Sequence, residues 1–328
     1  MPRKISRAAI AAITALIVIA GAAAAWLSLG GLRNGKPAER PQIAFGPLTD
    51  ETLHDPDNPA RVFHVDFARL EHDLPLTRPD IVKLTPENLQ TLTQEEIDQV
   101  YGRLTAGPIP DGFHQGGLFF ARSGSPGAAG DLKTRLGDII GGLGGQIADD
   151  KVKRLEQLGR AIWKGKRFYR GQRLLRNVIE DHAVLKLILD NGDESKIEKI
   201  TVPRKGWLAR ILPATDAWLL FPAKLYCGQS LLDGRRESVI IDYAYTDELP
   251  GYMAKPDDLA GRGGLRIRDE IRMVRPGFYL GRAYMNRMFL LNFTLYDPDT
   301  ADNGLKGFID GAPVEEDCWP GEQGRTAE

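Results

Sequence analysis

Cysteine is scarce in this chain. The 328 residues include two cysteines, Cys227 and Cys318. Neither belongs to a CxxC pair or a Cys/His set with zinc spacing, so the sequence does not indicate a structural metal site. In an oxidising compartment the two could form a disulfide, and closing so long a loop would contribute about 4 kcal/mol in the chain-entropy model. Alternatively, Cys227 is an apolar strand residue and Cys318 is a free thiol in a loose tail.

Catalytic motifs are also missing. There is no Gly-x-Ser-x-Gly elbow, and Lys133 is not preceded by the glycine of a phosphate loop. The sequence indicates no cofactor, and enzyme activity stays an open alternative. We expect surface or capping roles for most of the histidines, with His114 as the outside candidate for function because it lies in a predicted loop. The five histidines are His54, His64, His72, His114 and His182.

An excess of basic charge is absent too. The net charge is −1, and several basic residues gather before residue 34, which leaves the rest of the chain slightly acidic. A nucleic-acid interface needs basic side chains in excess on one face. We therefore expect no nucleic-acid partner.

Uncharged residues fill positions 8–29, after Arg3, Lys4 and Arg7. A helix of this length covers a hydrocarbon core of roughly 30 Å. The cationic start should stay in the cytoplasm, so the remainder is expected in a bacterial periplasm. The small residues around Ala24 resemble a signal-peptidase site, but Trp26, Leu27 and Leu29 continue the apolar run. An uncleaved signal anchor in the inner membrane is thus predicted over a cleaved signal peptide.

The rest of the chain divides by composition into four parts. Residues 34–82 are predicted to be a linker and extended arm, 83–162 a helical region, 163–297 an antiparallel barrel and 298–328 a polar, irregular tail. Thr93 and Glu96 form a capping box that predicts a helix start. After Trp163 the pattern has a period of two, typical of strands joined by short turns. Strands are expected at 183–189, 197–202, 217–228, 237–245, 265–274, 278–285 and 288–296. The predicted fold is therefore α+β: an N-terminal transmembrane helix, a helical arm and a lipocalin-like barrel.

The Pro276-Gly277 turn predicts how the two strands around it pair. Pairing Arg275 with Phe278 would place Asp269 and Arg282 diagonally on one mostly apolar face. Two such charges should pair, since an unpaired buried charge loses several kcal/mol of hydration. They are either a salt bridge that fixes the register or the polar floor of a ligand cavity, with Tyr284, Tyr243 and Tyr245 nearby.

Trp163 stands where the helical region meets the barrel. There it could plug the barrel end, with a glycine allowing close backbone approach and a Lys or Arg over its ring. Here the chain resembles a bacterial lipocalin-like family named for a GXWXG motif, although Gly159 lies four positions before Trp163 instead of two. The resemblance covers residues 160–297 and implies a small calycin-like barrel with an internal pocket. It is carried by the stretches 163–168, 239–243, 268–274, 280–282 and 289–295.

Together these features predict a membrane-tethered periplasmic barrel that binds a small apolar ligand with one polar end. Its candidate ligand-binding residues are Asp269, Arg282, Tyr284, Tyr243, Tyr245 and Trp163. One alternative is an enzyme in which Asp269 or Asp242 accepts a proton and Tyr243 or Tyr284 steadies an oxyanion. Another is a scaffold whose barrel is filled by its own side chains while its arm docks a membrane partner.

Overall fold

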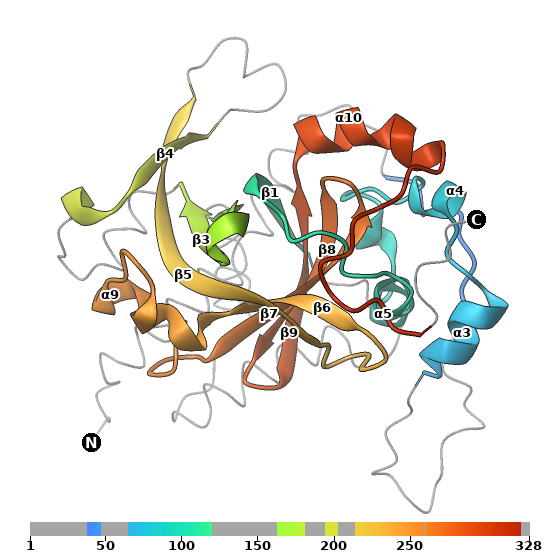
Figure 1. Ribbon diagram of the computed structural model, residues 1–328, viewed down its shortest axis with the longest axis horizontal. Helices are drawn as coiled ribbons and strands as arrows, with labels where there is room; N and C mark the ends of the chain where they lie inside the picture. The colour runs from blue at the N-terminus through green and yellow to red at the C-terminus, as the bar shows by residue number, and fades with distance from the viewer. Residues whose placement is uncertain are drawn as a thin grey trace, which may run out of the picture.

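The computed structural model describes residues 38–46, 65–119, 163–180, 194–202, 214–258 and 260–322. Nine strands of the described residues form one antiparallel sheet (Figure 1). They are β1 (Gly112–Phe119), β2 (Trp163–Tyr169), β3 (Leu174–Ile179), β4 (Lys199–Val202), β5 (Thr215–Gln229), β6 (Glu237–Asp242), β7 (Ile267–Arg275), β8 (Phe278–Met285) and β9 (Met288–Tyr296).

The sheet closes on itself. Its strand order is β3-β2-β1-β9-β8-β7-β6-β5-β4, and β3 pairs in addition with β5. Eight strands therefore form a ring, and β4 extends from the first part of β5 outside it. The predicted antiparallel barrel is confirmed.

Most of the predicted barrel strands agree with the structure, but three observed strands were not predicted. The predictions from 197–202 onward correspond to β4 through β9. The missed strands are β1, β2 and β3, and β1 lies inside the range 83–162 that we expected to be helical. The expected strand at 183–189 falls outside the described residues.

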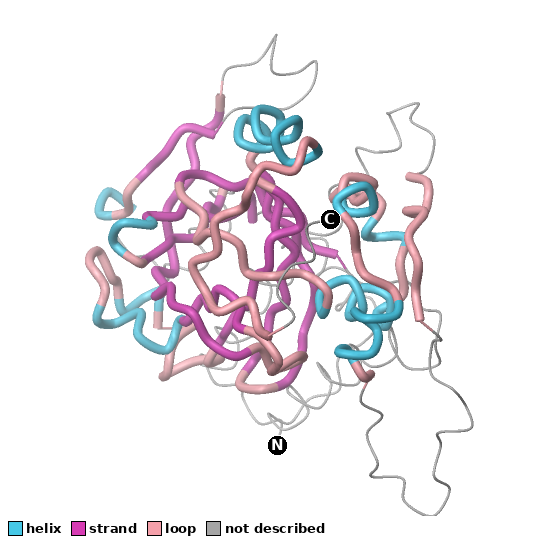
Figure 2. Tube along the Cα trace, turned by 45° about the vertical axis from the view of Figure 1, so that its right-hand side comes forward, coloured by secondary structure: helices cyan, strands magenta, loops and turns pink. Residues whose placement is uncertain are grey.

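A layer of short helices covers the outer face of β7 and β8 (Figures 1 and 2). It contains α3 (Phe67–Asp73), α4 (Arg78–Ile81), the 3-10 turn η3 (Leu89–Thr91) and α5 (Gln94–Gly102). α3 and α4 lie within the range 34–82 that we expected to be an extended arm. Apolar side chains of α4, η3, α5 and the turns between them form a second core against Val274, Phe278 and Leu280, whereas the first core fills the barrel.

The helix predicted at Thr93 is confirmed. Thr93 accepts a hydrogen bond from the backbone of Glu96, and the Glu96 side chain accepts one from the backbone of Thr93. The apolar residues Ile97, Val100 and Leu104, in and just after this helix, are buried in the second core. Local capping and tertiary packing thus specify the same helix.

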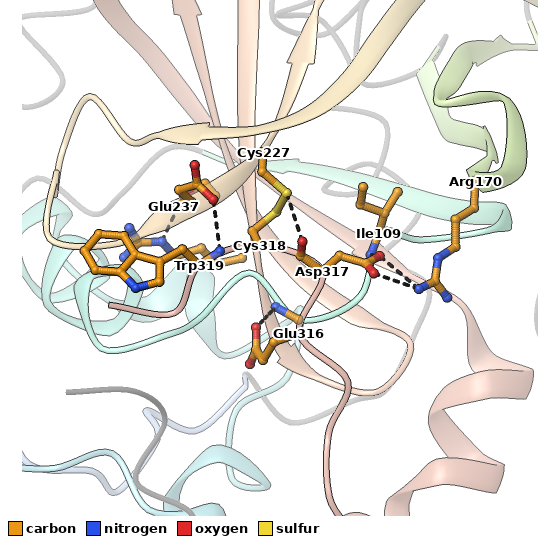
Figure 3. The surroundings of a disulfide bond; sticks show 11 residues. Ile109, Arg170, Cys227, Glu237, Glu316, Asp317, Cys318 and Trp319 are labelled. Carbon is orange, nitrogen blue, oxygen red and sulfur yellow. Dashed lines mark hydrogen bonds and ion pairs between the residues drawn. A yellow bond between two sulfur atoms is a disulfide. The ribbon is translucent and has the colours of Figure 1, made fainter. Parts of the chain in front are cut away.

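The prediction of an irregular tail over 298–328 is wrong for residues 298–309, which form a helix, whereas the described residues 310–322 contain no helix or strand. Asp297 caps α10 (Pro298–Ile309), and Pro298 at its first position suits a helix start. Beyond α10 the chain runs to Cys318, which forms a disulfide with Cys227 on β5 (Figure 3). Of the two alternatives for the cysteines, the structure has the disulfide.

In the described part of the chain, no helix combines the length and apolar character needed to cross a bilayer. Residues 8–29, on which the membrane prediction rests, lie outside the described residues, as do His54, His64 and His182.

Candidate functional site

A one-residue slip in the β7–β8 hairpin decides which side chains enter the barrel. Arg275 pairs with Phe278 as predicted, but Met273 pairs with Tyr279, so Val274 is an extra residue in β7. The slip places Asp269 opposite Ala283 instead of Tyr284. Residues directly opposite one another project from the same face, so a shift of one position exchanges the faces.

The predicted pairing of Asp269 with Arg282 is therefore wrong. Asp269 faces the barrel interior, whereas Arg282 lies opposite Glu270 on the outer face. There Arg282 forms an ion pair with Asp98 of α5 and donates a hydrogen bond to the Tyr284 hydroxyl at 2.9 Å. Burial tends to lower the pKa of Arg282, but the charge of Asp98, the Tyr284 hydroxyl and the hydrogen bonds to both together outweigh it, and the pKa is raised. Arg282 and Tyr284 thus hold α5 against the barrel wall.

Tyr245 also lies away from the barrel interior. It belongs to η7 (Tyr243–Glu248), and 39% of its surface is exposed. The Lys224 ammonium lies 4.3 Å from the centre of its ring, and Arg262 lies beside it. This tyrosine forms a surface cation-π group.

The charge that does meet Asp269 is Lys166 on β2. The Lys166 Nζ atom donates to Asp269 Oδ2 at 2.9 Å, to the Tyr243 hydroxyl at 2.7 Å and to Asn177 Oδ1 at 3.0 Å. Trp163 Nε1 donates to the same Asn177 oxygen at 3.0 Å. All five side chains are buried. We call them the interior polar cluster.

Aromatic rings surround the ammonium of this cluster. Lys166 Nζ lies 5.4 Å from the ring centre of Trp163, 5.4 Å from that of Tyr243 and 5.5 Å from that of Phe293. These distances fall within the range of cation-π attraction. The predicted cation over the Trp163 ring is thus Lys166. A Cβ atom on Gly116 would lie 2.2 Å from the Trp163 ring, so this ring requires a glycine on β1.

Burial perturbs the proton affinities in the cluster. Burial acts to lower the pKa of Lys166, but the charge of Asp269, the nearby Tyr243 hydroxyl and the hydrogen bonds to both together outweigh it, and the pKa is raised. Burial raises the pKa of Asp269, with the Lys166 ammonium acting in the opposite direction. Burial raises the pKa of Tyr243 to about 12 despite the nearby ammonium. Lys166 therefore keeps its proton, which argues against a nucleophilic amine.

The cluster lines a small, partly enclosed cavity inside the barrel. Its apolar wall includes Leu118, Phe221, Ala283 and Phe293. The space open to the centres of water-sized molecules is about 20 Å³, and about 10–15 Å³ suffices for one water. The site therefore has room for a group of hydroxyl size, while most of the barrel is filled by side chains.

Of the candidate ligand-binding residues, Trp163, Tyr243 and Asp269 line this cavity. The structure adds Lys166 and Asn177, which the sequence reasoning missed. A signal for Lys166 existed: it follows Trp163 in the stretch that resembles the GXWXG family. Its inward direction depends on the irregular pairing of β2 with β3 between Trp163 and Gly165, which breaks the alternation of faces.

The described residues offer one group with metal-ligand character, formed by Cys227, Glu237 and Cys318. Both sulfur atoms of this group are bonded to each other in the disulfide (Figure 3). A disulfide sulfur is not a thiolate, which is the metal ligand. The group therefore does not supply a cation site while the disulfide is intact.

Comparisons of this chain with protein-family models, with curated proteins and with solved structures give no match.

Proposed function

We propose that this chain is a membrane-tethered barrel protein of the bacterial periplasm that binds a small molecule at the interior polar cluster. The ligand would have a mostly apolar body and one polar end. The observation that carries the proposal is the Lys166–Asp269 ion pair beside the cavity. A barrel core needs no buried charges to be stable, and a buried ion pair is often no better than apolar side chains of similar volume. Buried charges with perturbed pKa values beside a cavity favour a binding site.

Two features support the location. The apolar run at 8–29 follows basic residues, which is typical of a signal anchor with its C-terminal side exported. The Cys227–Cys318 disulfide suits an oxidising compartment such as the periplasm. The resemblance to the GXWXG family adds a lipocalin-like barrel class to this proposal.

A scaffold is the second candidate function, and the small cavity volume favours it. In that case the barrel is a packed support for the helical layer, which would contact a membrane partner. An enzyme is less favoured. Asp269 and Tyr284 lie on opposite faces of the sheet, and the Asp269 carboxylate is buried and held by Lys166.

Native mass spectrometry of the full chain distinguishes binder from scaffold. We expect a small molecule to co-purify and to be released on unfolding. Ala283→Leu, which places a larger side chain in the cavity, should abolish it. Ala223→Leu is the matched control, because Ala223 is a buried barrel alanine that does not line the cavity.

The melting temperature of each variant shows whether it is folded. If both variants are folded and Ala283→Leu loses the bound molecule while Ala223→Leu keeps it, the cavity is supported as the binding site. A wild-type chain that carries nothing would contradict the proposed function and favour the scaffold.

A further inference from the structure

The side-chain hydrogen-bond donors of the interior polar cluster are already bonded within the protein. The three protons of Lys166 go to Asp269, Tyr243 and Asn177, and Trp163 donates to Asn177. Asn177 Nδ2 donates to the Phe221 carbonyl oxygen at 3.2 Å and to the Tyr243 hydroxyl at 2.9 Å. The Tyr243 hydroxyl in turn lies 3.4 Å from Asp269 Oδ2 and can donate to it.

One carboxylate oxygen of the cluster accepts no hydrogen bond from the described residues. Asp269 Oδ1 is buried and has no hydrogen-bond partner among the residues that the structure describes. Leaving a buried polar atom unpaired is costly, and the cost is larger for a charged group. Asp269 lines the cavity, which has room for a group of hydroxyl size.

We infer that the cavity accepts a neutral hydrogen-bond donor, the hydroxyl group of an alcohol, whose O–H donates to Asp269 Oδ1. This inference rests on the proposed function and names the polar end of its ligand. Neutrality follows because the charges of Lys166 and Asp269 already compensate each other, so an ammonium would add an unbalanced buried charge. A ligand carboxylate would lie next to the like-charged Asp269 oxygen, and no hydrogen-bond donor of the cluster is free to bind it.

Two isomers test the inference: 1-butanol, which has a donor, and methyl propyl ether, which lacks one. The full chain in lipid nanodiscs is titrated with each, and binding to empty nanodiscs is subtracted. We expect the wild type to prefer the alcohol by at least about tenfold, as a hydrogen bond to a charged group implies.

The variant Asp269→Asn should remove this preference. Its carboxamide oxygen can keep the contact with Lys166, which turns the NH₂ group toward the position of Oδ1 and presents a donor to the cavity. The ether should then bind about as well as the alcohol. Asp233→Asn is the matched control: Asp233 is also buried and ion-paired, with Arg235 and Arg272, but outside the cavity, so the preference should persist.

The wild-type comparison alone decides the inference if Asp269→Asn fails to fold. Equal binding of both isomers, tighter binding of butylammonium than of butanol, or binding of neither isomer overturns it. The proposed function falls separately, if native mass spectrometry finds no molecule on the wild type. A bound natural molecule that Ala283→Leu loses and that lacks a hydroxyl would keep the function and overturn the inference.

Discussion

Lys166 keeps its charge inside an apolar barrel because its surroundings replace water on every side. Three oxygen atoms accept its protons, and three aromatic rings lie within 5.5 Å of Nζ. Desolvating an ion costs several kcal/mol unless such contacts compensate it. The same contacts fix the Trp163, Asn177 and Tyr243 side chains, so the ammonium organises the wall of the cavity.

His114 gives a prediction on pH at the residue scale. It faces the barrel interior on β1, where its ring packs edge-on against Phe168 and Tyr279, and its Nδ1 atom has no hydrogen-bond partner in the described part of the chain. Burial lowers the pKa of His114 to about 4, and the more distant carboxylate of Asp297 opposes this only weakly. Below about pH 6.5 the unfolded chain binds a proton that the folded chain does not take up until about pH 4.

The free energy of unfolding should therefore fall as the pH is lowered through this window. For His114 alone the loss between pH 7 and pH 5 is about 2 kcal/mol. The free energies of unfolding of the wild type and of His114→Phe are measured in urea at pH 7 and at pH 5. The loss is the change in the difference between the two proteins from one pH to the other. Asp257, whose pKa burial raises to about 6, acts in the opposite direction but is present in both proteins. Parallel pH profiles would contradict the prediction.

At the scale of elements, the C-terminal segment after α10 connects three parts of the fold (Figure 3). Glu316 accepts a hydrogen bond from the backbone of Gly107 at 2.7 Å, and Asp317 accepts one from Ile109 at 2.7 Å and pairs with Arg170. Cys318 belongs to the barrel core and is covalently joined to β5. The segment therefore packs against the barrel and contributes Cys318 to its core.

Removing the disulfide should destabilise the fold substantially. The bond joins cysteines 91 positions apart, and a loop of this size corresponds to about 4 kcal/mol in the chain-entropy model. We expect Cys227→Ala with Cys318→Ala to lower the free energy of unfolding by about this amount in urea titrations. A reductant should have a similar effect on the wild type and none on the double variant. Unchanged unfolding of the reduced wild type would contradict the prediction.

The outcome for the strands shows what a sequence pattern can and cannot specify. β5 to β9 are rich in β-branched and aromatic residues, so their period of two is visible. β1 contains glycines at 112, 116 and 117, and Gly116 is explained only by the Trp163 ring that packs on it. In β2 and β3 the interior positions include Lys166 and Asn177, which look like surface residues until their partners Tyr243 of η7 and Asp269 of β7 are known.

The site was predicted in part for the same reason. The alternation along β7 correctly placed Asp269 inside, and the Pro-Gly turn correctly paired Arg275 with Phe278. The extra residue Val274 then exchanged the faces of β8, which moved Arg282 outward. A bulge depends on packing at both faces of the sheet, here the barrel core beneath Met273 and the helical layer over Val274. Local turn chemistry does not contain that information.

At the scale of the whole molecule, the barrel wall carries buried charges on both faces. Inside is the Lys166–Asp269 pair; outside, Arg272 pairs with Asp233, and Arg282 with Asp98, beneath the helical layer. The outer pairs are formed with partners from α5 and from the loop after β5, so they join the layers. Glu270 on the outer face and Asp269 inside each keep one carboxylate oxygen without a hydrogen-bond partner among the described residues, but of the two only Asp269 lines the cavity. The outer charges therefore serve assembly of the layers, and the inner pair is the one suited to a ligand.

The last prediction concerns where the whole chain resides. If residues 8–29 are a retained anchor, the mature protein should fractionate with membranes, withstand a high-salt wash and require detergent for release. Its N-terminal sequence should begin before residue 8, and Cys227 and Cys318 should be protected from thiol reagents added to intact cells. A soluble mature chain that begins near Ala25 would contradict the membrane tether but would agree with export to the periplasm. An intact N-terminus on a soluble chain with reactive thiols would contradict both, because neither the membrane nor an oxidising compartment would then be involved.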